Sequence, residues 1–188
     1  MRRITLLLLA VVTTGSVAAY IFTTSGQTNE AAAPIYGVKI PPGYRDWRMI
    51  SVANVGEPVN DLRVKLGNDL AIKAIREGTP FPDGAIIARL AYRAVTSEEN
   101  NKVFRAAAER QGLAANQIEK LLAGSFIAGP ATNVQFMVKD SKKYASTGGW
   151  GFAEFTDGKP SSEAVHNTCF VCHTPAKDRD FVFTRYSP

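Results

Sequence analysis

The sequence is poor in the side chains that bind metals. It contains two cysteines and two histidines in 188 residues. A zinc site would take four soft ligands, usually supplied as two cysteine pairs, and the chain cannot supply the second pair. Runs of lysine and arginine interleaved with aromatics, which indicate nucleic-acid binding, are also missing. The net charge of +5 is spread along the chain, so we interpret it as a solvated surface that suits an acidic redox partner.

The two cysteines lie together in one short motif, Cys169-Phe170-Val171-Cys172-His173. Two cysteines and a following histidine at this spacing are typical of c-type haem attachment. Each thiol adds to a vinyl group of the porphyrin, and the adjacent imidazole reaches the iron. The motif therefore predicts one covalent haem c per chain, with Cys169 and Cys172 binding the cofactor and His173 binding the metal. A lone disulfide or a redox-active thiol pair is the alternative.

The first residues of the chain predict export. Arg2 and Arg3 precede an apolar run at 4–22, which is the layout of a secretory signal or an uncleaved membrane anchor. Polar residues at 13–16 interrupt the run and make it a mediocre membrane span. Both readings place the folded part in the periplasm, where haem c is assembled. We expect a signal peptide or anchor at 1–27, a linker at 28–42 and one haem c domain at 43–188.

The body of the chain is long enough to bury one core, and its patterns favour strands over helices. Alternation at 62–66 predicts a half-buried strand. Asn68 predicts the N-cap of a helix that runs through Glu77 and ends at Gly78. Further strands are expected at 47–52, 85–95, 134–138, 149–155 and 181–185, and helical segments at 97–122 (broken at Gly112), 140–145 and 161–172. Strands and helices do not alternate regularly, so the sequence favours an α+β fold with a mostly antiparallel sheet.

Six segments of the body resemble the cytochrome P-460 family, which includes the cytochromes c′-beta. They are Pro41–Trp47, Phe81–Gly84, Val138–Lys142, Gly149–Phe152, the haem motif and Asp180–Tyr186. They occur in the family's order, and residues 97–123 look like an insertion relative to shorter members. The resemblance implies an antiparallel sheet, a homodimer and one haem c per subunit with His173 as proximal ligand. It also implies an open distal face, where nitric oxide binds or hydroxylamine is oxidised.

One position separates these two activities. Family members that oxidise hydroxylamine carry a lysine joined covalently to the haem ring, shortly after the Asp-Gly turn. Counted from Asp83-Gly84, the matching residue here is Arg89. A guanidinium stays charged and delocalised, whereas a desolvated lysine can lose its proton and become a nucleophile. We therefore expect no lysine cross-link from this position, and we expect Lys65 and Lys73 on the surface.

Strand alternation and the family resemblance predict different orientations for the Arg89 side chain. Alternation along 85–95 alone puts Arg89 on a solvent-facing side together with Arg93. The resemblance instead places Arg89 near the distal face of the haem. There it would hydrogen-bond a bound anion or polar diatomic ligand, or pair with a haem propionate.

Two further distal-pocket candidates are Phe81 and Glu154. Phe81, like Trp150 and Phe152, would cover the haem with an apolar ring, although aromatic side chains usually serve the core. Glu154 is the carboxylate that would serve proton transfer.

A sixth iron ligand would make the protein an electron carrier, and three residues are candidates for this ligand. His166 lies seven residues before His173 on the same side of a helix, so a surface or capping role is the better interpretation. Met49 and Met137 lie in apolar strand patterns, and core packing is the expected role of each.

Three functions remain compatible with the sequence. The first is a five-coordinate haem c protein that binds small ligands such as nitric oxide. The second is an oxidoreductase acting on hydroxylamine or nitric oxide, weakened by Arg89. The third is a six-coordinate electron-transfer subunit of a membrane complex, anchored by residues 4–22.

Overall fold

The structure, a computed structural model, describes residues 31–187. The predicted signal or anchor at 1–27, with its apolar run at 4–22, lies outside the described residues. Among the residues that are described, no helix is both long enough and apolar enough to cross a bilayer.

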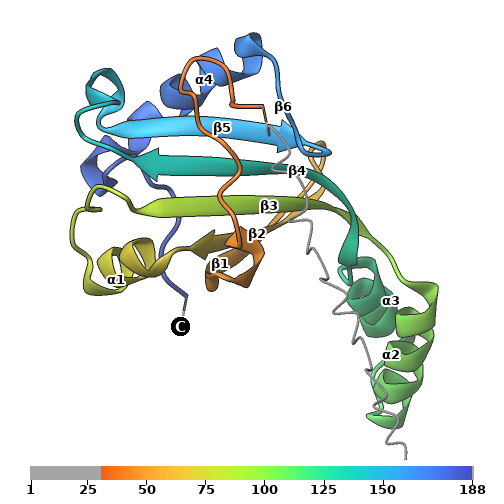
Figure 1. Cartoon of the computed structure of the whole chain (residues 1–188). Helices are drawn as coiled ribbons and strands as arrows, with labels where there is room; N and C mark the ends of the chain where they lie inside the picture. Colours follow the sequence, from red (N-terminus) through yellow and green to blue (C-terminus); the bar gives the residue numbers. More distant parts are fainter. Residues whose placement is uncertain (1–30, 188) are drawn as a thin grey trace, which may run out of the picture.

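A six-stranded antiparallel sheet forms the centre of the molecule (Figure 1), and its strands are ordered as in the sequence. The strands are β1 (Arg48–Val55), β2 (Asp61–Gly67), β3 (Ile86–Val95), β4 (Ile127–Lys139), β5 (Trp150–Thr156) and β6 (Lys159–Pro160). Every strand therefore pairs with the strand that follows it in the chain, as hairpin connections allow. This architecture confirms the predicted α+β fold.

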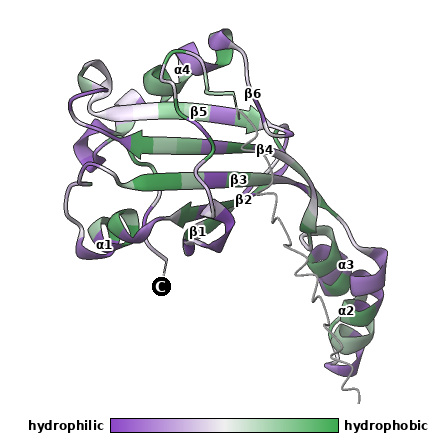
Figure 2. Cartoon of the chain, viewed as in Figure 1, coloured by the Kyte–Doolittle hydropathy of each residue, from purple (hydrophilic) through white to green (hydrophobic). Residues whose placement is uncertain are grey.

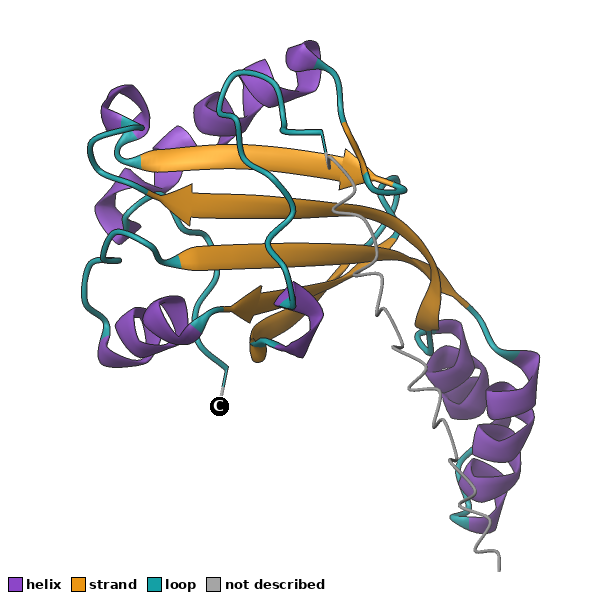
Figure 3. Ribbon diagram, in the orientation of Figure 1, coloured by secondary structure: helices purple, strands orange, loops and turns teal. Residues whose placement is uncertain are grey.

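Within residues 31–187, four α-helices accompany the sheet (Figure 3). They are α1 (Asp69–Glu77), α2 (Glu98–Arg110), α3 (Ala115–Ala123) and α4 (Glu163–His173), with short 3₁₀ segments at Tyr44–Asp46, Ala145–Thr147 and Thr174–Arg179. The helix α1 begins and ends where the sequence predicts. The Asn68 side chain accepts a hydrogen bond from the Ala71 N–H at 3.0 Å, and Gly78 takes the left-handed conformation with φ 66°.

The strand predicted at 181–185 is wrong. This segment is irregular, and Asp180 and Phe181 both have positive φ, at 51° and 62°. Its backbone groups bind partners outside the sheet: the Phe181 carbonyl accepts a hydrogen bond from the His173 ring at 2.7 Å. The segment therefore serves as a strap behind the sheet (Figure 1) rather than as a seventh strand.

The two faces of the sheet carry different side chains. On one face, Leu66, Ala88 and Phe136 are register partners and are buried. The segment before β1, orange in Figure 1, crosses this face. Its Tyr44 ring packs edge-on against the Phe136 ring, with ring centroids 5.1 Å apart. Ala33, inside the segment expected as a linker, is also buried in this core. The core of the protein thus begins before residue 43.

The opposite face carries a polar row. Lys65, Arg89, Gln135 and Glu154 are register partners across β2, β3, β4 and β5. Figure 2 shows the corresponding polar bands within otherwise apolar β3 and β4. This face therefore supplies the polar side chains of the candidate site.

The helices α2 and α3 form a hairpin that projects away from the sheet (Figures 1 and 3). They have a small cluster of their own, made of Ala108, Ile118 and Leu122, with Leu113 packed against it. The turn between them contains Gly112 with φ 77°, where the sequence predicts a break. Residues 97–123, which resemble an insertion, thus form a distinct unit at the ends of β3 and β4.

Candidate functional site

The helix α4 presents the cysteine–histidine motif in its last turns. The Ser162 hydroxyl caps its start by accepting from the Val165 N–H at 3.4 Å. Cys169 and Cys172 are three residues apart, so they lie on neighbouring turns of the same side of the helix. Cys169 is partly buried against the core and Cys172 is exposed, and both thiols are free.

The environment of Cys169 does not suit a redox-active thiol. Burial raises the pKa of the Cys169 thiol to about 11, and the Glu154 carboxylate and Cys172 act in the same direction. Redox-active cysteines have a lowered pKa, because the thiolate is the reacting form. The surroundings of Cys169 therefore argue against a redox-active thiol at this position.

His173 is held in one orientation by the C-terminal strap. Its Nδ1 lies 2.7 Å from the Phe181 carbonyl oxygen. A carbonyl only accepts, so Nδ1 carries the proton and Nε2 keeps its lone pair. The ring packs against Phe152 and Phe183, with ring-centroid distances of 5.0 and 5.2 Å. In metal-binding histidines, the ring nitrogen that does not bind the metal usually donates to a fixed acceptor. Nδ1 of His173 does so here, which leaves Nε2 for a metal.

The protonation state of His173 supports the same role. Burial lowers the pKa of His173, the hydrogen bond to the Phe181 carbonyl opposes this shift, and Arg89 lowers the pKa further. The result is a pKa below the ordinary value of 6.5. A neutral imidazole is the form that binds a metal.

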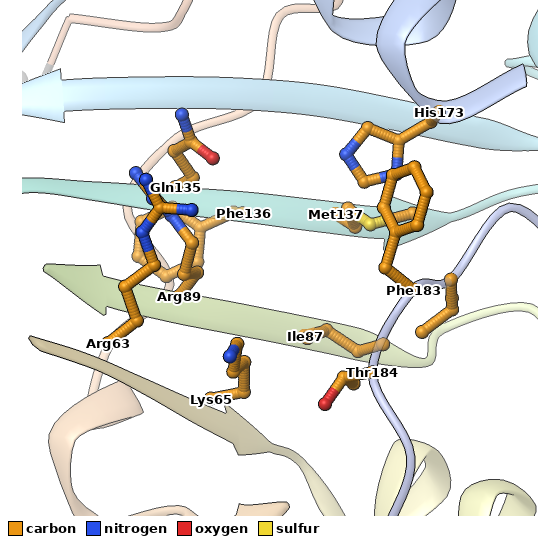
Figure 4. Close-up of a pocket in the computed structure, with 11 residues that line it drawn as sticks. Arg63, Lys65, Ile87, Arg89, Gln135, Phe136, Met137, His173, Phe183 and Thr184 are labelled. Atoms are coloured by element: carbon orange, nitrogen blue, oxygen red, sulfur yellow. The ribbon is translucent and has the colours of Figure 1, made fainter. Parts of the chain in front are cut away.

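A cavity of about 390 Å³ separates His173 from the polar face of the sheet (Figure 4). This volume is typical of small-molecule pockets. Its walls come from β2, β3, β4, α4 and the strap. The lining residues are Arg63, Lys65, Ile87, Arg89, Gln135, Phe136, Met137, His173, Val182, Phe183 and Thr184.

Arg89 lines this cavity, whereas strand alternation alone predicts that it faces solvent. Strand alternation marks which side chains share a face, but α4 and the strap cover this face and make it an interior wall. Arg89 donates a hydrogen bond to the Asn133 side chain. Burial, and then the neighbouring Arg63, lower the pKa of Arg89 to about 10, so it is positively charged at neutral pH.

Glu154 borders the cavity through Gln135. The Gln135 amide donates to one carboxylate oxygen of Glu154, and the Ser161 hydroxyl donates to the other at 2.8 Å. Both oxygens are therefore occupied by protein donors. This places Glu154 in the polar row, one residue away from the lining of the cavity.

Phe81 does not line the cavity with His173. It is buried in the core, where its ring packs edge-on against Trp150 with centroids 5.4 Å apart. Phe152, in contrast, contacts His173 directly. Of the three aromatic candidates, only Phe152 contacts the predicted iron ligand.

Three expectations about neighbouring residues are wrong. Lys65, expected on the surface, lines the cavity, while Lys73 is exposed as expected. His166 is fully buried, and both of its ring nitrogens have partners: Nε2 accepts from the Glu154 N–H at 3.1 Å, and Nδ1 donates to the Ser162 carbonyl at 2.9 Å. Met49 is half-exposed rather than in the core, whereas Met137 is buried and lines the cavity.

Sequence reasoning missed Arg63 and Asp180 as site residues. Arg63 shares the alternation of Lys65, but the pattern cannot tell a solvent face from a cavity wall. Asp180 accepts from Lys139 Nζ at 2.6 Å, from Trp150 Nε1 at 3.1 Å and from the Phe81 N–H at 3.1 Å. These bonds hold Asp180 in place directly before Phe181, where the strap begins. The sequence feature that could have pointed to Asp180 is the segment 180–186, which resembles the cytochrome P-460 family.

The residues of this site can be compared with known protein families. Among the described residues, no group of three or more histidine, cysteine or acidic side chains could hold a metal by itself. No curated protein matches the chain significantly. The family model described as Cytochrome P460 matches residues 41–184, which include all of the sheet and the cysteine–histidine motif. The chain therefore belongs to the cytochrome P460 family, whose members bind haem.

Proposed function

We propose that this protein is an exported mono-haem c cytochrome that binds small ligands such as nitric oxide at an open iron position. In this proposal Cys169 and Cys172 attach the haem and His173 is its axial ligand. The observation that carries the proposal is the hydrogen bond from His173 Nδ1 to the Phe181 carbonyl. It leaves Nε2 available in a ring that lines the cavity.

The residues around the cavity fit a haem in their chemistry. Ile87, Met137 and Phe183 provide apolar contacts near His173, and the other end of the cavity is lined by cationic side chains. A haem combines an apolar ring with two carboxylates, and its iron supplies the affinity for diatomic ligands. The chain would exclude water with its aromatic side chains and would orient the imidazole through the strap.

Substitution of the two cysteines tests the covalent attachment of the haem, with substitution of a residue between them as the control. We expect Cys169→Ala combined with Cys172→Ala to release the haem under denaturing extraction, because no thioether remains. Val171 is exposed, at 70% of its surface, so Val171→Ala is the matched control and should keep the haem bound. Haem that stays with the double variant would contradict the attachment.

The iron coordination is tested by optical and electron paramagnetic resonance spectra of the purified holoprotein. A five-coordinate high-spin ferrous spectrum that changes on addition of nitric oxide supports the proposal. Sharp low-spin α and β bands without added ligand would contradict it.

A six-coordinate electron-transfer protein is the second candidate function, and Met137 favours it. This methionine is buried and lines the same cavity as His173, and thioether ligands are known in electron-transfer haems. The two strand methionines provide a matched pair. If the haem is low-spin in the wild type, loss of that state in Met137→Leu and its retention in Met49→Leu would establish this alternative.

Hydroxylamine or nitric oxide oxidation is the third candidate. We propose that it is not the main activity, because Arg89 stands at the position of the cross-linking lysine. Mass spectrometry of the tryptic haem peptide tests this directly. We expect haem attached only to the peptide with Cys169 and Cys172; a second peptide, such as one with Lys65, would overturn the expectation.

Localisation in the periplasm and a homodimer complete the proposal. Both predictions rest on the sequence: the localisation on the apolar run at 4–22 that follows two arginines, and the homodimer on the family resemblance. Cell fractionation and sedimentation of the mature protein test them separately.

A further inference from the structure

Three cationic side chains gather in the cavity that contains His173. Arg63 and Lys65 come from β2 and Arg89 comes from β3, where it is the register partner of Lys65. Figure 4 shows the Arg63 and Arg89 side chains next to each other, with Lys65 farther along β2. We call these three residues the cationic cluster.

The cationic cluster is only partly neutralised by carboxylates. Arg63 pairs with Asp61 at 3.3 Å. Among the ion pairs within residues 31–187, none includes Lys65 or Arg89. The other nearby carboxylate, Glu154, is bound by Gln135 and Ser161. The cavity wall therefore carries more positive than negative charge.

The cluster also has donors without acceptors. The Nε–H groups of Arg63 and Arg89 are both buried, and neither has a hydrogen-bond partner among residues 31–187. A buried donor left unsatisfied has lost its hydrogen bonds to water without replacing them, which destabilises the folded protein. Most buried polar groups in folded proteins are hydrogen-bonded, so an unsatisfied one needs an explanation such as a bound ion, a water molecule or a functional role.

Mutual repulsion adds to this cost. Burial, Arg63 and Arg89 lower the pKa of Lys65. Burial and Arg63 lower the pKa of Arg89 to about 10, although the Glu154 and Asp61 carboxylates act in the opposite direction. Like charges held together under partial burial are a mark of functional sites. An anion placed among the three side chains would relieve the repulsion and offer acceptors to their free donors.

We propose that Arg63, Lys65 and Arg89 bind a planar oxyanion inside the cavity that contains His173. The geometry suits a delocalised anion, because guanidinium groups match carboxylates and related oxyanions in shape and charge. Two sources share this chemistry: a free nitrogen oxyanion such as nitrite, and a propionate of the bound haem. This inference rests on the proposed function, since it assigns the ligand class of the same cavity.

The test uses the haem-loaded protein and two lysine variants with the same change in charge. Lys65→Met removes a charge from the cavity, and Lys73→Met removes one from the exposed side of α1. Affinity is measured by calorimetry with nitrite and with nitrate, which has the same charge and binds iron poorly. Nitric oxide serves as the uncharged probe.

We expect Lys65→Met to weaken nitrite and nitrate binding about tenfold or more, as loss of a hydrogen bond from a charged donor implies. Lys73→Met should leave these affinities unchanged, and Lys65→Arg should restore them. The affinity for nitric oxide should change little in Lys65→Met. This pattern would assign the cluster to a free anion.

A different pattern would assign the cluster to the propionate. Free anions would then bind weakly to every variant, and the haem reduction potential would shift in Lys65→Met but not in Lys73→Met. Unchanged anion affinity together with an unchanged potential would overturn the inference. Absence of nitric oxide binding in the wild type would instead contradict the proposed function, and nitrate binding would still decide the role of the cluster.

Discussion

At the residue scale, the orientation of His173 depends on a side chain that never touches it. Asp180 accepts hydrogen bonds from Lys139, Trp150 and the backbone of Phe81. The carbonyl of the next residue, Phe181, accepts from His173. Asp180 has φ 51°, a conformation in which these bonds hold an otherwise unfavourable backbone. Asp180 is therefore a positioning residue for the predicted iron ligand.

We expect Asp180→Ala to destabilise the folded protein by about 3 kcal/mol, because it breaks a largely buried ion pair and leaves Lys139 unpaired. The His173 ring should also lose its fixed orientation, and with His173 as the proposed axial ligand this would change the ferrous spectrum and the reduction potential. Urea unfolding and spectroelectrochemistry measure the two effects. The exposed neighbour Asp178 provides the control Asp178→Ala. A stability loss without any change in spectrum or potential would contradict the positioning role.

At the element scale, β5 approaches its neighbours closely at Gly151. A Cβ built at this glycine would overlap the Tyr144 ring. The Tyr144 hydroxyl donates to the Tyr36 carbonyl at 3.0 Å, and the two rings meet edge-on. Gly151 thus allows Tyr144 to connect the segment before β1 with the sheet.

We predict that Gly151→Ala destabilises the protein by about 1–3 kcal/mol, the usual cost of overpacking a filled core. Gly56 has open space around its Cβ position, so Gly56→Ala should have little effect. Thermal or urea unfolding of the two variants provides the comparison. Equal stability of both would show that Tyr144 moves away at no cost.

Another element-scale contact joins the turn before β3 to the segment after β4. The Asp83 carboxylate accepts from the Ser141 hydroxyl and from the Ser141 N–H, both at 2.7 Å. These bonds lower the pKa of Asp83 below its ordinary value of 3.8, with Lys139 and Lys142 contributing in the same direction. A carboxylate with a depressed pKa in the folded state stabilises the fold only while it is ionised.

The stabilisation by Asp83 should therefore depend on pH. We expect it to be complete above the unfolded-state pKa, near 3.8, and to disappear as the pH falls through the lower folded-state pKa. Wild type should exceed Asp83→Asn in the free energy of unfolding at neutral pH, and the difference should shrink below that point. A difference that stays constant into acid would rule out a role of the ionised carboxylate.

At the scale of the whole molecule, the α2–α3 hairpin is separable from the sheet. It packs on its own cluster of Ala108, Ile118 and Leu122. Val95 and Ile127, at its two ends, are register partners of β3 and β4. The strands at the base of the hairpin are thus already close enough for a tight turn.

We expect a variant in which an Asn-Gly turn replaces residues 96–126 to fold and to keep its haem spectrum. The melting temperature should change little, because the main core and the cavity take no side chain from the hairpin. Circular dichroism and the optical spectrum measure this. Loss of haem in the shortened variant would show that the hairpin supports the site.

The sequence by itself determined the local features of this protein. Asn68 and Gly78 set the ends of α1 because capping depends on neighbouring backbone groups. The motif at 169–173 predicts haem attachment because that chemistry requires only adjacent residues. The antiparallel α+β class followed from the irregular order of strands and helices, and the family match supports the haem.

The tertiary structure decided which side chains meet. The alternation of Arg63, Lys65 and Arg89 looks the same for a solvent face and for the wall of a cavity, and only the packing of α4 and the strap made it a wall. The segment after Asp180 has strand-like residues, but it became a strap because its carbonyl binds His173. Burial and register join residues far apart in the chain, so no local pattern contains them.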